Sequence, residues 1–308
     1  MNRKTTVLLL LCAMIVLLPK AARPMELSAS ASVQARTGSI GFSHDASSTN
    51  PMLGNPTSEL EYDRLSETLL SLRLEGKDEP AGAWFDLTAT IGLTSGGSFR
   101  DADFYRGQVL FSETLSKGLS ADEYGLNLRF SGDNWVWGNY SGFVLRPYLA
   151  GGFRQRRLSA RGLRCGDICG ALPGVAAGRE VIGQNVLDFY AGPGLWLEKE
   201  LSPRQRIDLK GEIGLGYRHV ADSHRLRPDL GPTPNIEYDF TLVRAHAELN
   251  YVHAITDKAG LTVGMFGGGA LGRGHVTYAA LTDTPFRSLP ARTWEWNAGL
   301  SVGLDIDF

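Results

Sequence analysis

The chain has 308 residues, a formal net charge of −2, 43% hydrophobic residues and 37 glycines. This composition argues against a basic nucleic-acid-binding protein, because such proteins carry an excess of Lys and Arg, and against a disordered chain, which would be poor in apolar residues. Length alone leaves open whether the chain forms one large domain or two ordinary ones.

The first 22 residues have the three regions of a secretory signal peptide. Two basic residues lie at positions 3 and 4, an apolar run covers 7–18, and Pro-Lys-Ala-Ala follows over 19–22. The alternative is a membrane anchor, but the run is well short of the roughly 20 apolar residues that a spanning helix needs. We expect cleavage near Ala22, with a second candidate site near Ala31, and a barrel domain over 23–308.

Apolar and polar residues alternate in segment after segment of the mature chain. In one segment, Leu209 and Ile213 would lie on one face and Asp208 and Lys210 on the other. Successive side chains of a strand point to opposite faces, so each segment suits a tilted membrane strand with one lipid-facing side. Ten segments are expected to form strands: 27–43, 58–75, 82–95, 122–132, 141–162, 182–200, 205–219, 238–256, 259–278 and 292–308. The predicted fold is therefore all-β, a ten-stranded antiparallel transmembrane β-barrel.

Short and long connections also alternate along the chain. The expected long connections are 44–57, 96–121, 163–181, 220–237 and 279–291. In outer-membrane barrels the short turns face the periplasm and the long loops face outward. We therefore expect a protein of the bacterial outer membrane, with lipid around it and both chain ends on the periplasmic side.

Two groups of polar residues fall in connections that are expected on the extracellular side. Asp101 and Asp103 lie two residues apart, and so do Asp222 and His224. In an extended backbone such residues point the same way. A carboxylate beside an imidazole orients the ring, whose other nitrogen can then take a proton from water, while opposing carboxylates can hold that water. The four residues predict a hydrolytic site; the alternative is that they are ordinary polar residues of solvated loops.

Two cysteines of the mature chain, Cys165 and Cys169, lie in a polar connection. Export would place them in an oxidising compartment, which predicts a small loop disulfide. Zinc binding is the alternative, but two thiols without nearby histidines supply only half of a structural zinc site.

At these residues the chain resembles the omptins, a family of ten-stranded outer-membrane proteases. Asp101 and Asp103 fall where the family has its Asp-x-Asp pair, and Asp222 and His224 match its Asp-x-His pair. The segment 58–63 resembles the family's second strand. The similarity to the signature on the fifth strand rests on Gly152, Phe153, Arg157, Ser159, Ala160 and Gly162.

The resemblance implies an outer-membrane endopeptidase that acts on peptides or proteins and not on nucleic acid. His224, oriented by Asp222, would activate a water that attacks a peptide carbonyl, with Asp101 and Asp103 opposite. No metal or cofactor is implied. Contact with lipopolysaccharide, which activity could require, is also implied, and Arg157 is the candidate because guanidinium pairs well with phosphate.

The sequence departs from the family pattern in two places. Residues 111–117 replace the expected Ser/His/Pro-containing signature, and Val220 stands where the family has an acid that binds a basic substrate side chain. The sequence therefore does not support a preference for cleavage beside Arg or Lys. Two alternatives to an enzyme remain: a non-catalytic barrel that acts as an adhesin or structural protein, and a small channel, which ranks lower because side chains largely fill a barrel of this size.

Overall fold

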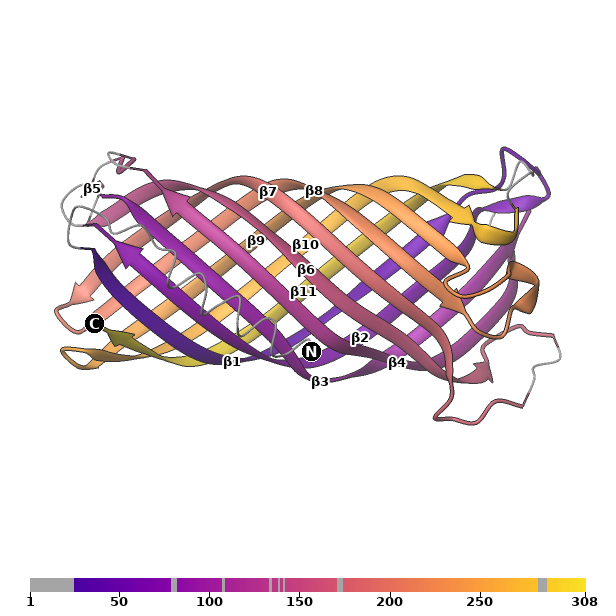
Figure 1. The fold of residues 1–308 in the computed structure, drawn as a ribbon, viewed down its shortest axis with the longest axis horizontal. Helices are drawn as coiled ribbons and strands as arrows, with labels where there is room; N and C mark the ends of the chain where they lie inside the picture. The colour runs from indigo at the N-terminus through magenta and orange to yellow at the C-terminus, as the bar shows by residue number, and fades with distance from the viewer. Residues whose placement is uncertain are drawn as a thin grey trace.

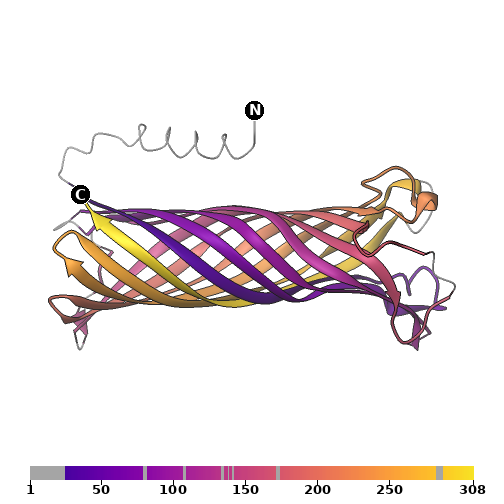
Figure 2. The same ribbon diagram turned by 90° about the horizontal axis from the view of Figure 1, so that it is seen from below.

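The computed structural model describes residues 25–78, 82–106, 109–132, 135–137, 139–140, 142–170, 174–281 and 287–308. These residues form one antiparallel barrel whose strands are tilted to its long axis, with the C-terminus at one end and most of the longer connections at the other (Figures 1 and 2). The expected signal peptide lies outside the described residues. None of the helices in the described part of the chain is long and apolar enough to cross a membrane.

Ten long strands build the wall. Their bounds are β1 (Glu26–His44), β2 (Leu53–Lys77), β3 (Trp84–Tyr105), β4 (Val109–Ser131), β6 (Phe143–Cys165), β7 (Glu180–Ser202), β8 (Gln205–His224), β9 (Ile236–Thr256), β10 (Ala259–Tyr278) and β11 (Ser288–Asp307). Neighbours in sequence pair with one another, β11 pairs with β1, and β4 pairs with β6, which closes the ring. The two-residue strand β5 (Asn139–Tyr140) pairs only with the start of β6 and takes no part in closing the ring, so the predicted ten-stranded barrel is confirmed.

Several strands are longer than predicted. β3 continues to Tyr105 and β4 begins at Val109, so the expected long connection over 96–121 is wrong: most of it is paired strand. β8 likewise runs on to His224. The prediction relied on an apolar outer face, which a strand has only where it contacts lipid. The backbone pairing continues beyond the lipid into water, where the outward residues are no longer apolar.

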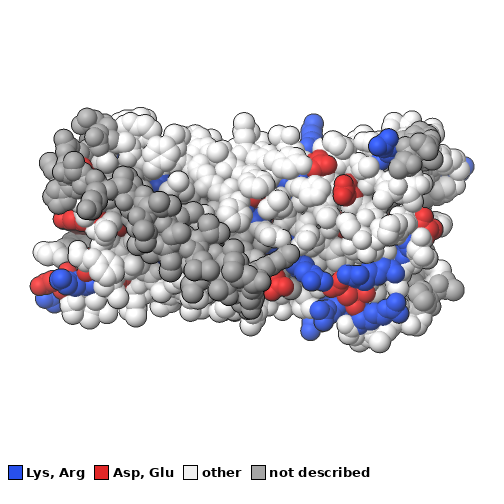
Figure 3. Space-filling view, in the orientation of Figure 1, with Lys and Arg blue, Asp and Glu red and all other residues white. Residues whose placement is uncertain are grey.

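The outer face divides into an apolar belt and a charged region nearer the long connections. The belt includes Val33, Leu128, Leu149, Phe189, Leu209, Ile213, Leu215, Leu249, Val263, Met265, Leu300 and Val302, all exposed. Beyond it, the outward positions include Glu61, Arg100, Arg157, Glu237 and Arg273. Figure 3 shows basic and acidic side chains gathered on the wall toward the end with the long connections. An apolar band below a charged rim is the surface expected of a membrane-spanning barrel that projects beyond the bilayer.

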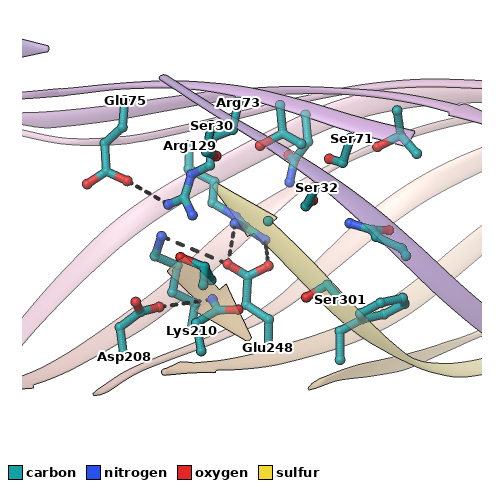
Figure 4. Close-up of a pocket in the computed structure, with 18 of the residues that line it drawn as sticks. Ser30, Ser32, Ser71, Arg73, Glu75, Arg129, Asp208, Lys210, Glu248 and Ser301 are labelled. Atoms are coloured by element: carbon teal, nitrogen blue, oxygen red, sulfur yellow. Dashed lines mark hydrogen bonds and ion pairs between the residues drawn. The ribbon is translucent and has the colours of Figure 1, made fainter. Parts of the chain in front are cut away.

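The half of the interior nearer the C-terminus contains a cavity of about 940 Å³. Its wall carries serines and paired charges, as Figure 4 shows. Arg73 lies 2.7 Å from Glu75, and Arg129 lies 2.9 Å from Glu248. The cavity is therefore polar, but each of these cations already has an anionic neighbour.

Above the cavity, two further levels fill the barrel. The first is a network of buried ion pairs formed by Arg36, Glu67, Glu123, Arg154, Arg156, Asp188, Arg218 and Glu295. The second is an apolar layer that includes Ile40, Phe42, Leu60, Tyr62, Phe99, Leu158, Val186, Val220, Tyr238 and Phe240. Side chains thus occupy the interior between the cavity and the rim, which argues against an open channel.

Candidate active site

The four predicted site residues lie on strands, not in loops as the sequence suggested. Asp101 and Asp103 are near the end of β3, where they pair with Leu60 and Ser58 of β2. Asp222 and His224 end β8. Because paired strands are stiffer than loops, these side chains are held by the wall itself.

Asp222 and His224 are in direct contact at the inner rim. The Nε2 atom of His224 lies 3.3 Å from Oδ2 of Asp222, and Asp222 is fully buried. Burial alone would lower the pKa of His224, but the charges of Asp222 and Asp101 outweigh it and raise the pKa above that of a free histidine. The pair thus has the arrangement of a base and its orienting carboxylate.

Two residues that the sequence did not reveal hold this pair. Gln184 lies opposite Asp222 in the register of β7 and β8, and its Nε2 donates to Oδ2 of Asp222 at 2.8 Å. Asn235 acts on the backbone: its Oδ1 accepts from the N–H of His224 at 2.9 Å, and its own N–H donates to the carbonyl of Asp222 at 3.0 Å. Both are almost fully buried. Only the strand register could have revealed Gln184, and register cannot be read from a single strand.

The two carboxylates of β3 have raised pKa values. The pKa of Asp101 is raised to about 7 by burial and by the charge of Asp103, with a smaller contribution from Asp222. The charge of His224 acts in the opposite direction. Burial also raises the pKa of Asp103, while a hydrogen bond from Ser58 acts in the other direction. Both carboxyl groups of β3 therefore keep their protons to a higher pH than a solvated aspartate does.

The structure brings Asp101 and the β8 pair within electrostatic reach of one another. Asp101 raises the pKa of His224, and His224 lowers that of Asp101, so each responds to the charge of the other. A water placed between a carboxylate and an imidazole can lose a proton to the ring while the carboxylate holds its second hydrogen. Among the described residues, no cluster of three or more His, Cys, Asp or Glu side chains could hold a metal ion.

A disulfide joins Cys165, the last residue of β6, to Cys169 in the connection that follows. This small loop packs on the outer wall beside the site, where the N–H of Asp167 donates to Glu113 at 2.8 Å. Glu113 in turn lies 2.6 Å from Arg100, the residue before Asp101. The disulfide loop therefore braces the outer side of the strand that carries the carboxylates.

Arg157 lies away from the four site residues, on the outer face of β6. About half of its side chain is exposed, and it lies 3.3 Å from Glu180, which also pairs with Arg225 at 2.7 Å. Lys117 and Arg161, exposed cross-strand partners on β4 and β6, are nearby. The outer wall thus carries several basic groups near the charged rim.

The sequence matches no family model and no curated protein. Among solved structures, the barrel is similar to the outer membrane protease OmpT from Escherichia coli, with a TM-score of 0.73 at 13% sequence identity, covering 92% of this chain and 97% of that one. Two further solved structures are much less similar. The translocator domain of the autotransporter NalP from Neisseria meningitidis has a TM-score of 0.36 at 12% identity, covering 99% of this chain and 96% of that one. A Pseudomonas aeruginosa FadL homologue has a TM-score of 0.32 at 9% identity, covering 92% of this chain and 90% of that one.

The fold is therefore that of an outer-membrane β-barrel. More particularly, it is the ten-stranded barrel of OmpT, which confirms the resemblance to the omptins at the level of the fold.

Proposed function

We propose that this chain is an omptin-like endopeptidase of the bacterial outer membrane, with its site facing the extracellular side. The observation that carries the proposal is the contact between His224 and a fully buried Asp222, within electrostatic reach of Asp101, at the rim of an OmpT-like barrel. A carboxylate and imidazole facing a second carboxylate supply what peptide hydrolysis by water needs: a base, a group that orients it, and a group that holds the water.

In the proposed reaction, Asp222 holds the His224 ring and stabilises the positive charge that it acquires. Water loses a proton to His224 as its oxygen bonds to the carbonyl carbon, and the carbonyl π electrons move onto oxygen. Asp101 and Asp103 position the water. The tetrahedral intermediate then collapses: the C–N bond breaks, His224 returns the proton to the leaving nitrogen, and a carboxylic acid and an amine form. The acid then passes its proton, the second one of the water, to the amine, so that a carboxylate and an ammonium group are released.

The substrate is proposed to be a peptide or protein without a basic residue at the cleavage point. Val220, two residues before Asp222, is fully buried in the apolar layer together with Phe42 and Tyr238. Such neighbours offer a substrate Lys or Arg side chain no counter-charge.

Lipopolysaccharide is the proposed lipid partner, with Arg157 contacting a phosphate. Its support is the position of Arg157 on the outer wall, half exposed, with Lys117 and Arg161 also exposed nearby. Guanidinium and ammonium groups at the edge of the lipid belt can pair with phosphates of the outer leaflet.

The test is cleavage of a peptide library by purified protein refolded in detergent with lipopolysaccharide. The parent should cleave, and Asp101→Ala and His224→Ala should both fail. The matched control is His219→Ala, which removes an outward-facing histidine of the same strand and should leave cleavage intact. Equal inactivity of all four proteins would support the non-catalytic barrel instead.

A further inference from the structure

A tyrosine and a histidine that the proposed reaction does not use lie together at the same rim. Tyr278 ends β10 and His44 ends β1, and the hydroxyl of Tyr278 lies 3.1 Å from Nε2 of His44. The two rings meet edge to face with their centroids 5.8 Å apart. Tyr278 is partly exposed whereas His44 is buried, so the tyrosine is the member that a substrate can reach.

The strand register places this pair between the two halves of the candidate site. Ile236 of β9 pairs with Asp222 on one side and with Tyr278 on the other. Ser58 of β2 pairs in the same way with His44 and Asp103. Cross-strand partners point to the same face of a sheet, so Tyr278 and His44 face the space that Asp222 and Asp103 face.

Both groups stay uncharged near neutral pH. Burial and the charges of Asp222 and Asp103 raise the pKa of Tyr278, which keeps its proton. Burial, assisted by the charge of His224, lowers the pKa of His44 to about 4. A neutral His44 can donate from Nε2 to the tyrosine oxygen, which leaves the hydroxyl hydrogen of Tyr278 free to donate elsewhere.

The proposed reaction needs such a donor. When water adds to the carbonyl carbon, negative charge develops on the carbonyl oxygen in a space that already contains three carboxyl groups. Ionised carboxylates only accept hydrogen bonds, the carboxyl groups of β3 are engaged with the water in the proposed reaction, and the proton on His224 is committed to the leaving amine. A preorganised donor aimed at the developing oxyanion is the usual solution in acyl transfer.

We propose that Tyr278 is a further catalytic residue, which donates its hydroxyl hydrogen to the carbonyl oxygen of the substrate, and that His44 is the positioning residue that holds it. The inference rests on the proposed endopeptidase function. No proton is transferred in this contact: the hydrogen bond strengthens as the oxyanion forms and weakens when the C–N bond breaks.

The experiment compares Tyr278→Phe with Tyr217→Phe on a peptide that the parent cleaves. Tyr217 is the matched control because its hydroxyl also forms a hydrogen bond to a neighbouring side chain, that of Asp239, but on the outer face of the wall. Loss of an oxyanion donor should lower kcat by about 10²- to 10³-fold with KM nearly unchanged. The control should keep the kcat of the parent, and all proteins should show the same heat-modifiable mobility of a folded barrel.

A second pair of variants tests His44. His44→Leu cannot donate to Tyr278 and should lower kcat by about tenfold to a hundredfold, whereas His44→Gln retains a donor and should recover part of the loss. A peptide phosphinate, which mimics the tetrahedral intermediate, should bind Tyr278→Phe more weakly than the parent by a factor similar to the loss in kcat.

The outcomes separate the two proposals. If the parent cleaves and His224→Ala does not, but Tyr278→Phe retains the parental kcat and phosphinate affinity, the role of Tyr278 is overturned and the endopeptidase stands. If the parent neither cleaves any peptide nor binds the phosphinate, both proposals fail together.

Discussion

Strand β8 carries two histidines that each lie beside an aspartate, on opposite faces of the barrel wall. At the inner rim, His224 lies 3.3 Å from Asp222; on the outer face, His219 lies 3.0 Å from Asp239. The side chains of the outer pair are about one-third exposed, whereas that of Asp222 is fully buried. The same two residue types in similar contact thus occupy very different surroundings.

The surroundings decide what each pair can do. Gln184 and Asn235 fix the inner pair, and Asp101 faces it. The outer pair is met by the hydroxyl of Tyr217, which donates to Asp239, and by solvent. A contact between Asp and His is therefore weak support for catalysis by itself; burial, fixed orientation and an opposing carboxylate are what distinguish the inner pair.

The largest contrast between the two pairs should come from removing each imidazole. His224→Ala should lower kcat by about a thousandfold or more, since a general base contributes about 10²- to 10⁴-fold and its removal also leaves Asp222 buried without its partner. His219→Ala should change kcat little. Steady-state kinetics on one cleaved peptide provide the measurement, and comparable losses in the two variants would remove the distinction between the inner and outer pairs.

A smaller contrast should come from the residues that orient the inner pair. Gln184→Ala deletes a hydrogen bond to a buried carboxylate and should lower kcat by about tenfold to a hundredfold. The adjacent Asn185 is exposed, so Asn185→Ala is the control and should behave as the parent. A Gln184→Ala protein with parental kcat would mean that Asp222 needs no support from β7.

The pH response of His224 should reveal its neighbour across the rim. Because the charge of Asp101 raises the pKa of His224, Asp101→Asn should lower that pKa. Catalysis needs the neutral ring, so activity of the parent should fall as pH drops through the raised pKa of His224. NMR titration of the His224 ring in both proteins gives the comparison without relying on turnover, and an unchanged pKa in Asp101→Asn would show that the two groups do not interact.

The smallest effect should come from the disulfide loop on the outer wall. Replacing Cys165 and Cys169 by serine opens a very short loop and should lower the free energy of unfolding by about 2 kcal/mol or less. The rim residues themselves are held by strand pairing, so kcat should change little. Urea unfolding and peptide cleavage by the double variant test both statements, and loss of cleavage in a folded variant would mean that the loop does more than brace β3.

The sequence predicted the lipid-facing part of the barrel well and the part that projects into water poorly. Alternation of residues such as Leu209 and Asp208 reflects one face in lipid and one in the interior, and the structure has both faces as expected. Residues 96–121 show no such apolar face, although most of the described ones lie in paired strands. Local pattern therefore failed to predict that Asp101 lies on a strand.

The site was predictable in part for a related reason. The sequence pattern revealed Asp101, Asp103, Asp222 and His224, because residues two apart in an extended segment point to the same face. In the structure the members of each pair do share a face. The sequence pattern did not reveal Gln184, Asn235 and Tyr278, because their positions in the site depend on the register between strands. A β-bulge near Arg64, with φ of 51°, also shifts which residues of β2 face inward, from Glu67 below it to Tyr62 above it. A strict period of two cannot follow such a change.

The central claim is that the carboxylate of β3 and the imidazole of β8 act as one site. The most direct measurement is a double-mutant cycle on kcat/KM with Asp101→Asn, His224→Ala and the protein that carries both substitutions. Groups that act as one unit are strongly non-additive, so the double variant should be about as inactive as His224→Ala alone. If the two losses multiply instead, the residues act independently and the shared hydrolytic site is contradicted.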